Sequence, residues 1–135
     1  MMYYVVIDTN VLVSALMYRE SVPGIIVDHA LVGKIIPLLN QGITAEYNDV
    51  LFRPKFKFDK RAVNILLSGL TARAINIEDI KTEEYFSDPK DSVFYNVVME
   101  ARKDSDAFLV TGNLKHFPLR PYIVTPREML SILEP

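Results

Sequence analysis

Short apolar runs alternate with amphipathic stretches along the whole chain. The β-branched and aromatic run Tyr3–Ile7 predicts a buried strand that stops at Asp8. Further apolar runs predict strands at 35–39, 74–77, 107–111 and 122–124. Between them, apolar residues three and four apart predict helices at about 11–16, 25–32, 44–52, 59–70 and 89–101, and a last one after 125. Pro37 cannot donate to a ladder, so the second strand is expected at an edge or in an irregular segment.

Polar residues at the starts of several apolar stretches predict helix caps. Thr44 and Asp59 each precede such a stretch, and Asp88 followed by Pro89 has the form of a cap with a first-turn proline. Thr125 and Glu128 form a capping box, which predicts the start of the last helix.

Strands that alternate with helices over a short chain predict an α/β fold, with a mainly parallel central sheet covered by helices on both faces. The length of 135 residues fits one domain over 1–135. Such sheets bind ligands at the carboxyl ends of their strands. Asp8 and Asn10 follow the first strand, and Thr111 ends a later one, so we expect these side chains at one edge of the sheet.

Composition narrows the possible chemistry. The chain has no cysteine, which excludes disulfides, thiolate metal sites and cysteine nucleophiles and favours a cytoplasmic location. Its longest apolar runs are too short for a membrane span, and the start lacks the features of a secretion signal. The formal net charge of -2 is too small to indicate a polyanion partner by itself. Nucleic-acid binding would therefore need a local basic patch or bound cations.

Three acids could meet at the carboxyl edge of the sheet. Asp8 ends the first strand, Glu46 is expected early in the helix after the second strand, and Asp91 falls in the first turn of a later helix. Glu46 and Asp91 each have an equally good structural interpretation, because acids in a first turn stabilise the helix dipole. Asp8 favours a functional interpretation, since Asn10 could cap the first helix alone.

A cluster of carboxylates needs a cation if its members are to remain ionised together. Oxygen ligands, without cysteine and with two scattered histidines, favour Mg²⁺ or Mn²⁺ over zinc. The sequence therefore predicts a magnesium or manganese site at this edge.

Four stretches in order, "VIDTNVLVSAL", "TAEYNDVL", "DPKDSVFYNVVMEA" and "DAFLVTGNLKHF", resemble the PIN domain family, in its VapC-type toxin branch. The resemblance implies a three-layer α/β/α sandwich and a metal-dependent endoribonuclease that is the toxin of a toxin-antitoxin pair. Asp8, Glu46 and Asp91 match the family's acids, and Asn10 is the polar group beside the first. It also implies a cognate antitoxin on a separate chain, and we expect a homodimer.

The turn after the fourth predicted strand departs from the family pattern. The family often has an acid after Thr-Gly, whereas this chain has Asn113 after Thr111. The amide can contact a metal but carries no charge, so binding of a second ion is open. Asp88 is a nearby substitute that its capping role already explains, while Asp106 lies about 16 Å away along its strand. His116 could contact a phosphate, although a lone loop histidine is more often a surface or packing residue.

A basic segment lies between the third and fourth predicted helices. The stretch "RPKFKFDKR" interleaves two phenylalanines with five cations: Arg53, Lys55, Lys57, Lys60 and Arg61. Cations beside aromatic rings are typical of surfaces that bind single-stranded RNA. An equally good alternative is a solvated connection whose phenylalanines pack on the core.

Two other classes of function remain open. The chain could be a catalytically weak or inactive PIN-fold module that binds RNA or protein, which Asn113 favours. It could also be a phosphatase that uses Asp8 as phosphoryl acceptor. Haloacid-dehalogenase-type phosphatases repeat the aspartate two residues on, where this chain has Asn10, so this class fits less well.

Overall fold

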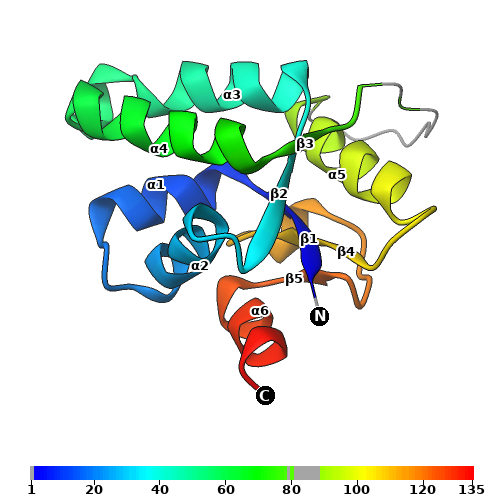
Figure 1. Ribbon diagram of the computed structural model, residues 1–135. Helices are drawn as coiled ribbons and strands as arrows, with labels where there is room; N and C mark the ends of the chain where they lie inside the picture. The colour runs from blue at the N-terminus through cyan, green and yellow to red at the C-terminus, as the bar shows by residue number, and fades with distance from the viewer. Residues whose placement is uncertain (1, 79, 81–88) are drawn as a thin grey trace.

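The computed structural model describes residues 2–78, 80 and 89–135 and places them in an alternating α/β arrangement (Figure 1). The strands are β1 (Tyr3–Ile7), β2 (Ile35–Leu39), β3 (Ile75–Asn76), β4 (Ala107–Val110) and β5 (Ile123–Val124). The helices are α1 (Thr9–Met17), α2 (Val22–Leu31), α3 (Gln41–Leu51), α4 (Lys60–Arg73), α5 (Pro89–Ala101) and α6 (Pro126–Leu133). Two short 3₁₀ turns, η1 (Pro54–Phe56) and η2 (Leu114–His116), follow α3 and β4.

The five strands form one parallel sheet in the order β3-β2-β1-β4-β5. The strands β2 and β3 lie on one side of β1, whereas β4 and β5 lie on the other. The direction of winding therefore reverses between β1 and β4. Open parallel sheets bind ligands at this reversal, beyond the carboxyl ends of the strands. The predicted α/β fold with a parallel sheet is confirmed.

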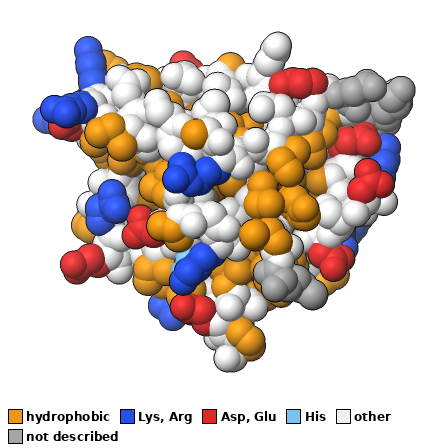
Figure 2. Space-filling view, viewed as in Figure 1, with side chains coloured by type: hydrophobic (Ala, Val, Ile, Leu, Met, Phe, Trp, Pro, Cys, Tyr) orange, Lys and Arg blue, Asp and Glu red, His pale blue; other side chains and the backbone are white. Residues whose placement is uncertain are grey.

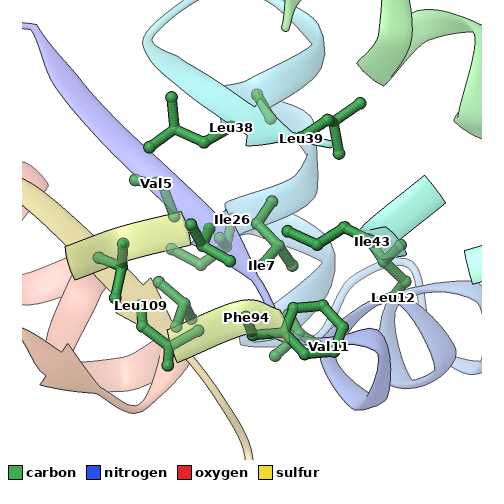
Figure 3. Packing of buried hydrophobic residues seen from close by; sticks show 14 of the residues in the cluster. Val5, Ile7, Val11, Leu12, Ile26, Leu38, Leu39, Ile43, Phe94 and Leu109 are labelled. Carbon is green, nitrogen blue, oxygen red and sulfur yellow. The ribbon is translucent and has the colours of Figure 1, made fainter. Parts of the chain in front are cut away.

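Helices cover both faces of the sheet. Helix α5 packs against β1, β2 and β4, while α2 and α4 pack against β2 and α6 packs against β5. Figure 1 shows α5 on one side of the strands and α1, α2 and α4 on the other. Figure 3 shows side chains from β1, α2, α3 and α5 meeting around Ile7 in the fully buried core. The molecule is thus the expected three-layer α/β/α sandwich.

The second strand differs from its prediction. β2 pairs with β1 on one side and β3 on the other, so it is an interior strand and not an edge. The β3 strand pairs only with Leu38 and Leu39, so Pro37 lies before this ladder begins. An interior position therefore accommodates a residue that has no N–H to donate.

Two of the predicted caps are confirmed and one is wrong. The Asp59 side chain accepts from the Arg61 N–H, and Thr125 and Glu128 form the reciprocal capping box. Helix α3, however, begins earlier than predicted, because Asn40 caps it through the Ile43 N–H. The predicted cap Asp88 lies outside the described residues. No helix in the described part of the chain is long and apolar enough to cross a membrane.

Candidate functional site

Asp8 and Thr111 follow the two neighbouring strands at which the winding of the sheet reverses. Ile7 is opposite Val110 in the β1–β4 register, so the next residue of each strand emerges at the same edge. The Asp8 N–H donates to the Val110 carbonyl at 2.9 Å, so the hydrogen bonding between β1 and β4 continues to Asp8. Both side chains are buried, with Asp8 7% exposed and Thr111 fully covered.

The Asp8 carboxylate is held by two side chains and does not cap the helix that follows it. The Thr111 hydroxyl donates to Asp8 Oδ2 at 2.8 Å, and Asn10 Nδ2 lies 3.3 Å from the same oxygen. Asp8 stands at the N-cap position of α1, yet its side chain accepts no capping hydrogen bond. A carboxylate at this position usually serves as the cap. The Asp8 side chain therefore does not serve as the N-cap of α1, although its position would allow it to.

The turn of residues 111–113 is fixed to the same group. The Gly112 N–H donates to Asn10 Oδ1 at 3.0 Å, and the Asn113 N–H donates to the Thr111 hydroxyl at 3.0 Å. A Cβ on Gly112 would lie 3.3 Å from Asn10 Oδ1, which is a tight contact. Glycine thus lets the backbone of the turn approach Asn10, and Asn10 connects the two strand ends.

The pKa of Asp8 is raised above its ordinary value. Burial is the largest cause, since it disfavours the charged form, and the negative charge of Asp91 acts in the same direction. The Thr111 hydroxyl, the Thr9 backbone N–H and the nearby His116 lower the pKa, but they do not compensate for burial. The site therefore holds two carboxylates that disfavour joint ionisation, as a cation-binding site does before it binds its cation.

Asp91 lies in the first turn of α5, as predicted, and has a histidine beside it. Nδ1 of His116 is 3.6 Å from Asp91 Oδ2, and Nε2 of the same ring is 3.0 Å from Asn113 Nδ2. The sequence left a phosphate contact open for His116 but favoured a surface or packing residue, and it did not predict a contact with Asp91. The missing signal is spatial, because the α5 start and the η2 turn meet only through the order of the strands.

Glu46 lies farther along its helix than predicted. Helix α3 begins at Gln41 and has no acid in its first turn, so the interpretation of Glu46 as a first-turn acid is wrong. The Glu46 side chain is half-buried and borders a hollow of about 330 Å³ between α3 and α5, together with Lys90 and Val93. It thus faces the helix that carries Asp91.

Tyr47, the neighbour of Glu46, was missed by sequence reasoning. Its ring is buried, and its hydroxyl donates to the Ile7 carbonyl, the last residue of β1. Burial raises the pKa of the Tyr47 hydroxyl, and the charge of Asp8 raises it further. The phenol therefore remains a neutral donor that fixes α3 against the end of β1. An aromatic residue in a helix carries no sequence signal for this role.

The oxygen atoms at this edge of the sheet are donors that a metal ion could use. Within residues 2–78, 80 and 89–135, no three histidine, aspartate or glutamate side chains are spaced to hold one ion. The two acids that interact electrostatically, Asp8 and Asp91, offer oxygen ligands, and the Thr111 hydroxyl supplies a further oxygen beside Asp8. This set suits a hard divalent cation. Asp88, predicted as an accessory acid, lies outside the described residues.

The basic segment of residues 53–61 lies at the connection between α3 and α4. Figure 2 shows Lys and Arg side chains gathered at the upper left, over this connection. Phe56 and Phe58 stack with ring centroids 5.3 Å apart, and the Lys55 ammonium lies 5.1 Å from the Phe56 centroid. Phe58 also packs against the core, as the structural alternative predicts. Arg53 forms a 2.7 Å ion pair with Asp49, so its charge is partly neutralised within the protein.

Asp106 and the remaining basic residues can also be placed. Asp106 is exposed and directly precedes β4, at the end of the strand opposite Thr111, as predicted. Lys57 is exposed in a left-handed conformation with φ of 56°, and Lys60 and Arg61 are exposed in the first turn of α4.

Comparison with known proteins gives three similarities. The model of a family described as the PIN domain matches residues 4–115. An uncharacterized protein of Methanocaldococcus jannaschii, MJ1680, is 32% identical over 119 residues, which cover 86% of this chain and 74% of that protein. A solved structure, that of the PIN domain endonuclease Utp24, is similar with a TM-score of 0.49 and 18% identity, over 84% of this chain and 74% of that chain.

Proposed function

This chain belongs to the PIN domain family, whose members are typically nucleases that use divalent metal ions, and we propose that it is a Mg²⁺- or Mn²⁺-dependent endoribonuclease. The observation that carries the proposal is the Asp8 carboxylate. It is buried at the reversal of the sheet, does not cap its helix, and has its pKa raised by burial and by Asp91. A buried acid with a perturbed pKa at the ligand-binding edge of an α/β sheet favours a functional role.

Asp8 and Asp91 would hold the metal ion as its principal ligands. Glu46 is the third acid of the proposed site and would approach from α3, while the Asn113 amide is a neutral fourth candidate. When bound, a divalent ion would lower the pKa of a water molecule and neutralise charge on the scissile phosphate. The ion would also relieve the repulsion that raises the pKa of Asp8.

The other polar residues of the site orient these ligands. Thr111 and Asn10 bond to Asp8 Oδ2, so they restrict the rotation of the carboxylate and direct its other oxygen. Metal ligands depend on such partners for their orientation. Phosphodiester hydrolysis by an activated water requires no side-chain nucleophile. The proposed catalytic residues are therefore Asp8, Glu46 and Asp91, acting through the metal and the water.

RNA would be held by the cations between α3 and α4. Lys55, Lys57, Lys60 and Arg61 are exposed there, and the paired rings of Phe56 and Phe58 offer an aromatic edge. Arg53 would contribute less, because Asp49 already pairs with it. A basic surface with aromatic rings suits single-stranded RNA, whose phosphates and bases are both accessible.

The biological role that we propose is that of the toxin in a toxin-antitoxin pair, acting in the cytoplasm as a homodimer and inhibited by a cognate antitoxin. The resemblance of four ordered motifs to VapC-type toxins supports this role. Induced expression would then arrest growth, and Asp8→Asn would abolish the arrest. Growth that is unaffected by the wild-type chain would contradict the toxin role but not the nuclease activity. Light scattering of the purified chain tests the dimer.

Cleavage of an end-labelled single-stranded RNA tests the enzymatic proposal. We expect the purified chain to cut the RNA with Mg²⁺ or Mn²⁺, to stop in EDTA, and to recover when metal is added back. Asp8→Asn, Asp91→Asn and Glu46→Gln should each abolish cleavage. Asp106→Asn is the matched control, because it removes the same charge at the opposite end of β4 and should cut normally.

The same experiment separates the nuclease from the inactive module. Asn113, which provides an amide where the family often has an acid, is the observation that favours the module. If wild-type and Asp8→Asn proteins bind RNA equally and neither cuts it with any divalent metal, the chain is a binding module. Wild-type cleavage that persists in Asp8→Asn would remove Asp8 from the mechanism.

A further inference from the structure

We propose that His116 is a positioning residue for Asp91 and that Asn113 holds its ring in the orientation required. This inference rests on the proposed function, because it assigns Asp91 to a metal ion. The His116 ring lies between the two residues, with Nε2 at 3.0 Å from Asn113 Nδ2 and Nδ1 at 3.6 Å from Asp91 Oδ2. Asn113 Nδ2 also lies 3.4 Å from Nδ1, so Nε2 is its nearer ring nitrogen, while Nδ1 is the nitrogen that faces Asp91.

In a neutral ring, the shorter contact with Asn113 favours the tautomer that carries its proton on Nδ1. An amide Nδ2 can only donate, so the ring nitrogen that accepts from Asn113 is unprotonated, and Nε2 at 3.0 Å is better placed to accept than Nδ1 at 3.4 Å. A neutral imidazole then carries its proton on Nδ1, which faces Asp91. A carboxylate can only accept, so the N–H is directed toward an acceptor. Hydrogens are therefore donated in one direction: Asn113 donates to His116, and the His116 N–H is directed toward Asp91.

The backbone of η2 holds Asn113 and His116 together. The His116 N–H donates to the Asn113 carbonyl at 3.1 Å, which closes the turn and brings the two side chains close together. The Asn113 N–H in turn donates to the Thr111 hydroxyl, which donates to Asp8. An unbroken series of polar contacts therefore connects the two proposed metal ligands, Asp8 and Asp91, through the turn after β4.

This arrangement explains why an asparagine suits position 113 better than an acid does. A carboxylate at position 113 could not donate to Nε2 of a neutral ring, whereas the amide can. Asn113 and His116 thus act as one unit, in which the amide selects the tautomer and the ring restrains the acid. Partners of this kind are important for metal sites, since their loss typically weakens metal binding by 10- to 100-fold.

Binding of Mn²⁺ to the free protein, measured by titration calorimetry without RNA, tests this inference. We expect His116→Phe, which removes both ring nitrogens, to weaken Mn²⁺ binding by about tenfold or more. His116→Asn keeps a donor near the position of Nδ1 and should recover most of the affinity. Lys115→Ala is the control for a change in the same exposed turn and should bind Mn²⁺ as the wild type does.

A double variant tests whether Asn113 acts through His116. Asn113→Leu alone should weaken Mn²⁺ binding, and Asn113→Leu in the His116→Phe background should add nothing, because the ring that it orients is already absent. Additive losses would instead make Asn113 an independent ligand and overturn its proposed role.

The remaining outcomes distinguish a failure of this inference from a failure of the proposed function. Unchanged Mn²⁺ affinity in a folded His116→Phe protein would overturn the positioning role, including the case in which only the KM for RNA rises and the ring contacts substrate. A wild-type chain that binds no Mn²⁺ and cuts no RNA would overturn the proposed function together with this inference. A wild type that binds and cuts, with His116→Phe unaffected, would overturn this inference alone.

Discussion

The Thr111 hydroxyl donates a 2.8 Å hydrogen bond to the Asp8 carboxylate across 103 positions of the chain. The contact exists because β1 and β4 are parallel neighbours in register, so their carboxyl ends place the two side chains together. The same hydroxyl accepts from the Asn113 N–H. One buried oxygen thus organises both the acid and the turn beside it.

Thr111→Val should destabilise the fold by about 1–3 kcal/mol, since it leaves the buried Asp8 carboxylate and the Asn113 N–H without this partner. It should also weaken Mn²⁺ binding, because Asp8 loses an orienting contact. Urea unfolding and metal titration measure the two effects. Thr71→Val, at an exposed position in α4, makes the same atomic change and should stay within about 0.5 kcal/mol of wild type. Equal unfolding midpoints for the two variants would contradict the proposed role of the hydroxyl.

The fold was largely predictable because its signals are local. Buried parallel strands appear as continuous apolar runs, as Tyr3–Ile7 does, and the Thr125 capping box marks a helix start within four residues. The strand order was not predictable, because it depends on contacts between distant segments. For the same reason Pro37 indicated an edge strand or an irregular segment, although β2 is an interior strand. Because β3 pairs only with Leu38 and Leu39, Pro37 lies before the β2–β3 ladder begins.

The candidate site, too, could be predicted from the sequence only in part. Asp8 and Thr111 could be located from the sequence, because each ends an apolar strand of a predicted parallel sheet. The contact of His116 with Asp91 joins η2 to α5, and the Tyr47 hydroxyl joins α3 to β1. Neither relation is encoded by residue spacing. Sequence reasoning therefore placed Asp8, Asn10 and Thr111 at this edge but missed the contacts of His116 and Tyr47.

Asp8→Asn should stabilise the metal-free protein at neutral pH. The pKa of Asp8 is raised in the folded state above its ordinary value of 3.8, so the folded chain binds the proton more tightly than the unfolded chain. The stability of the wild type therefore falls as pH rises from about that value through the folded pKa, and remains lower above it. The amide never ionises and loses nothing over this range.

Unfolding in EDTA at several pH values measures this difference. The gap between Asp8→Asn and wild type should be small at pH 3.5 and largest at pH 7. Saturating Mg²⁺ should narrow the gap at pH 7, because an ion that binds only the folded wild type stabilises it. A gap that does not change with pH would show that burial of the charged carboxylate has no cost.

Charge reversal in the basic segment should weaken RNA binding without affecting the metal site. Lys55→Glu with Lys57→Glu removes two exposed cations, so fewer counterions are released on binding and the dependence of affinity on salt becomes shallower. Binding to a labelled RNA in EDTA at several salt concentrations measures the slope. Arg127→Glu reverses a charge on α6 and should leave the slope unchanged. An unchanged slope in the double variant would return the segment to a structural role.

The last prediction concerns Asn113. Asn113→Asp adds a negative charge within reach of the His116 ring that contacts Asp91, so metal should be attracted more strongly and cleavage should saturate at a lower Mg²⁺ concentration. The new carboxylate cannot donate to Nε2, so the ring would be held by two acceptors, and a proton on each nitrogen would satisfy both. That proton cancels part of the added charge. The shift in the metal titration should therefore be larger in a His116→Phe background, where no ring can become cationic. Superimposed curves for wild type and Asn113→Asp in both backgrounds would mean that position 113 does not act on the metal electrostatically.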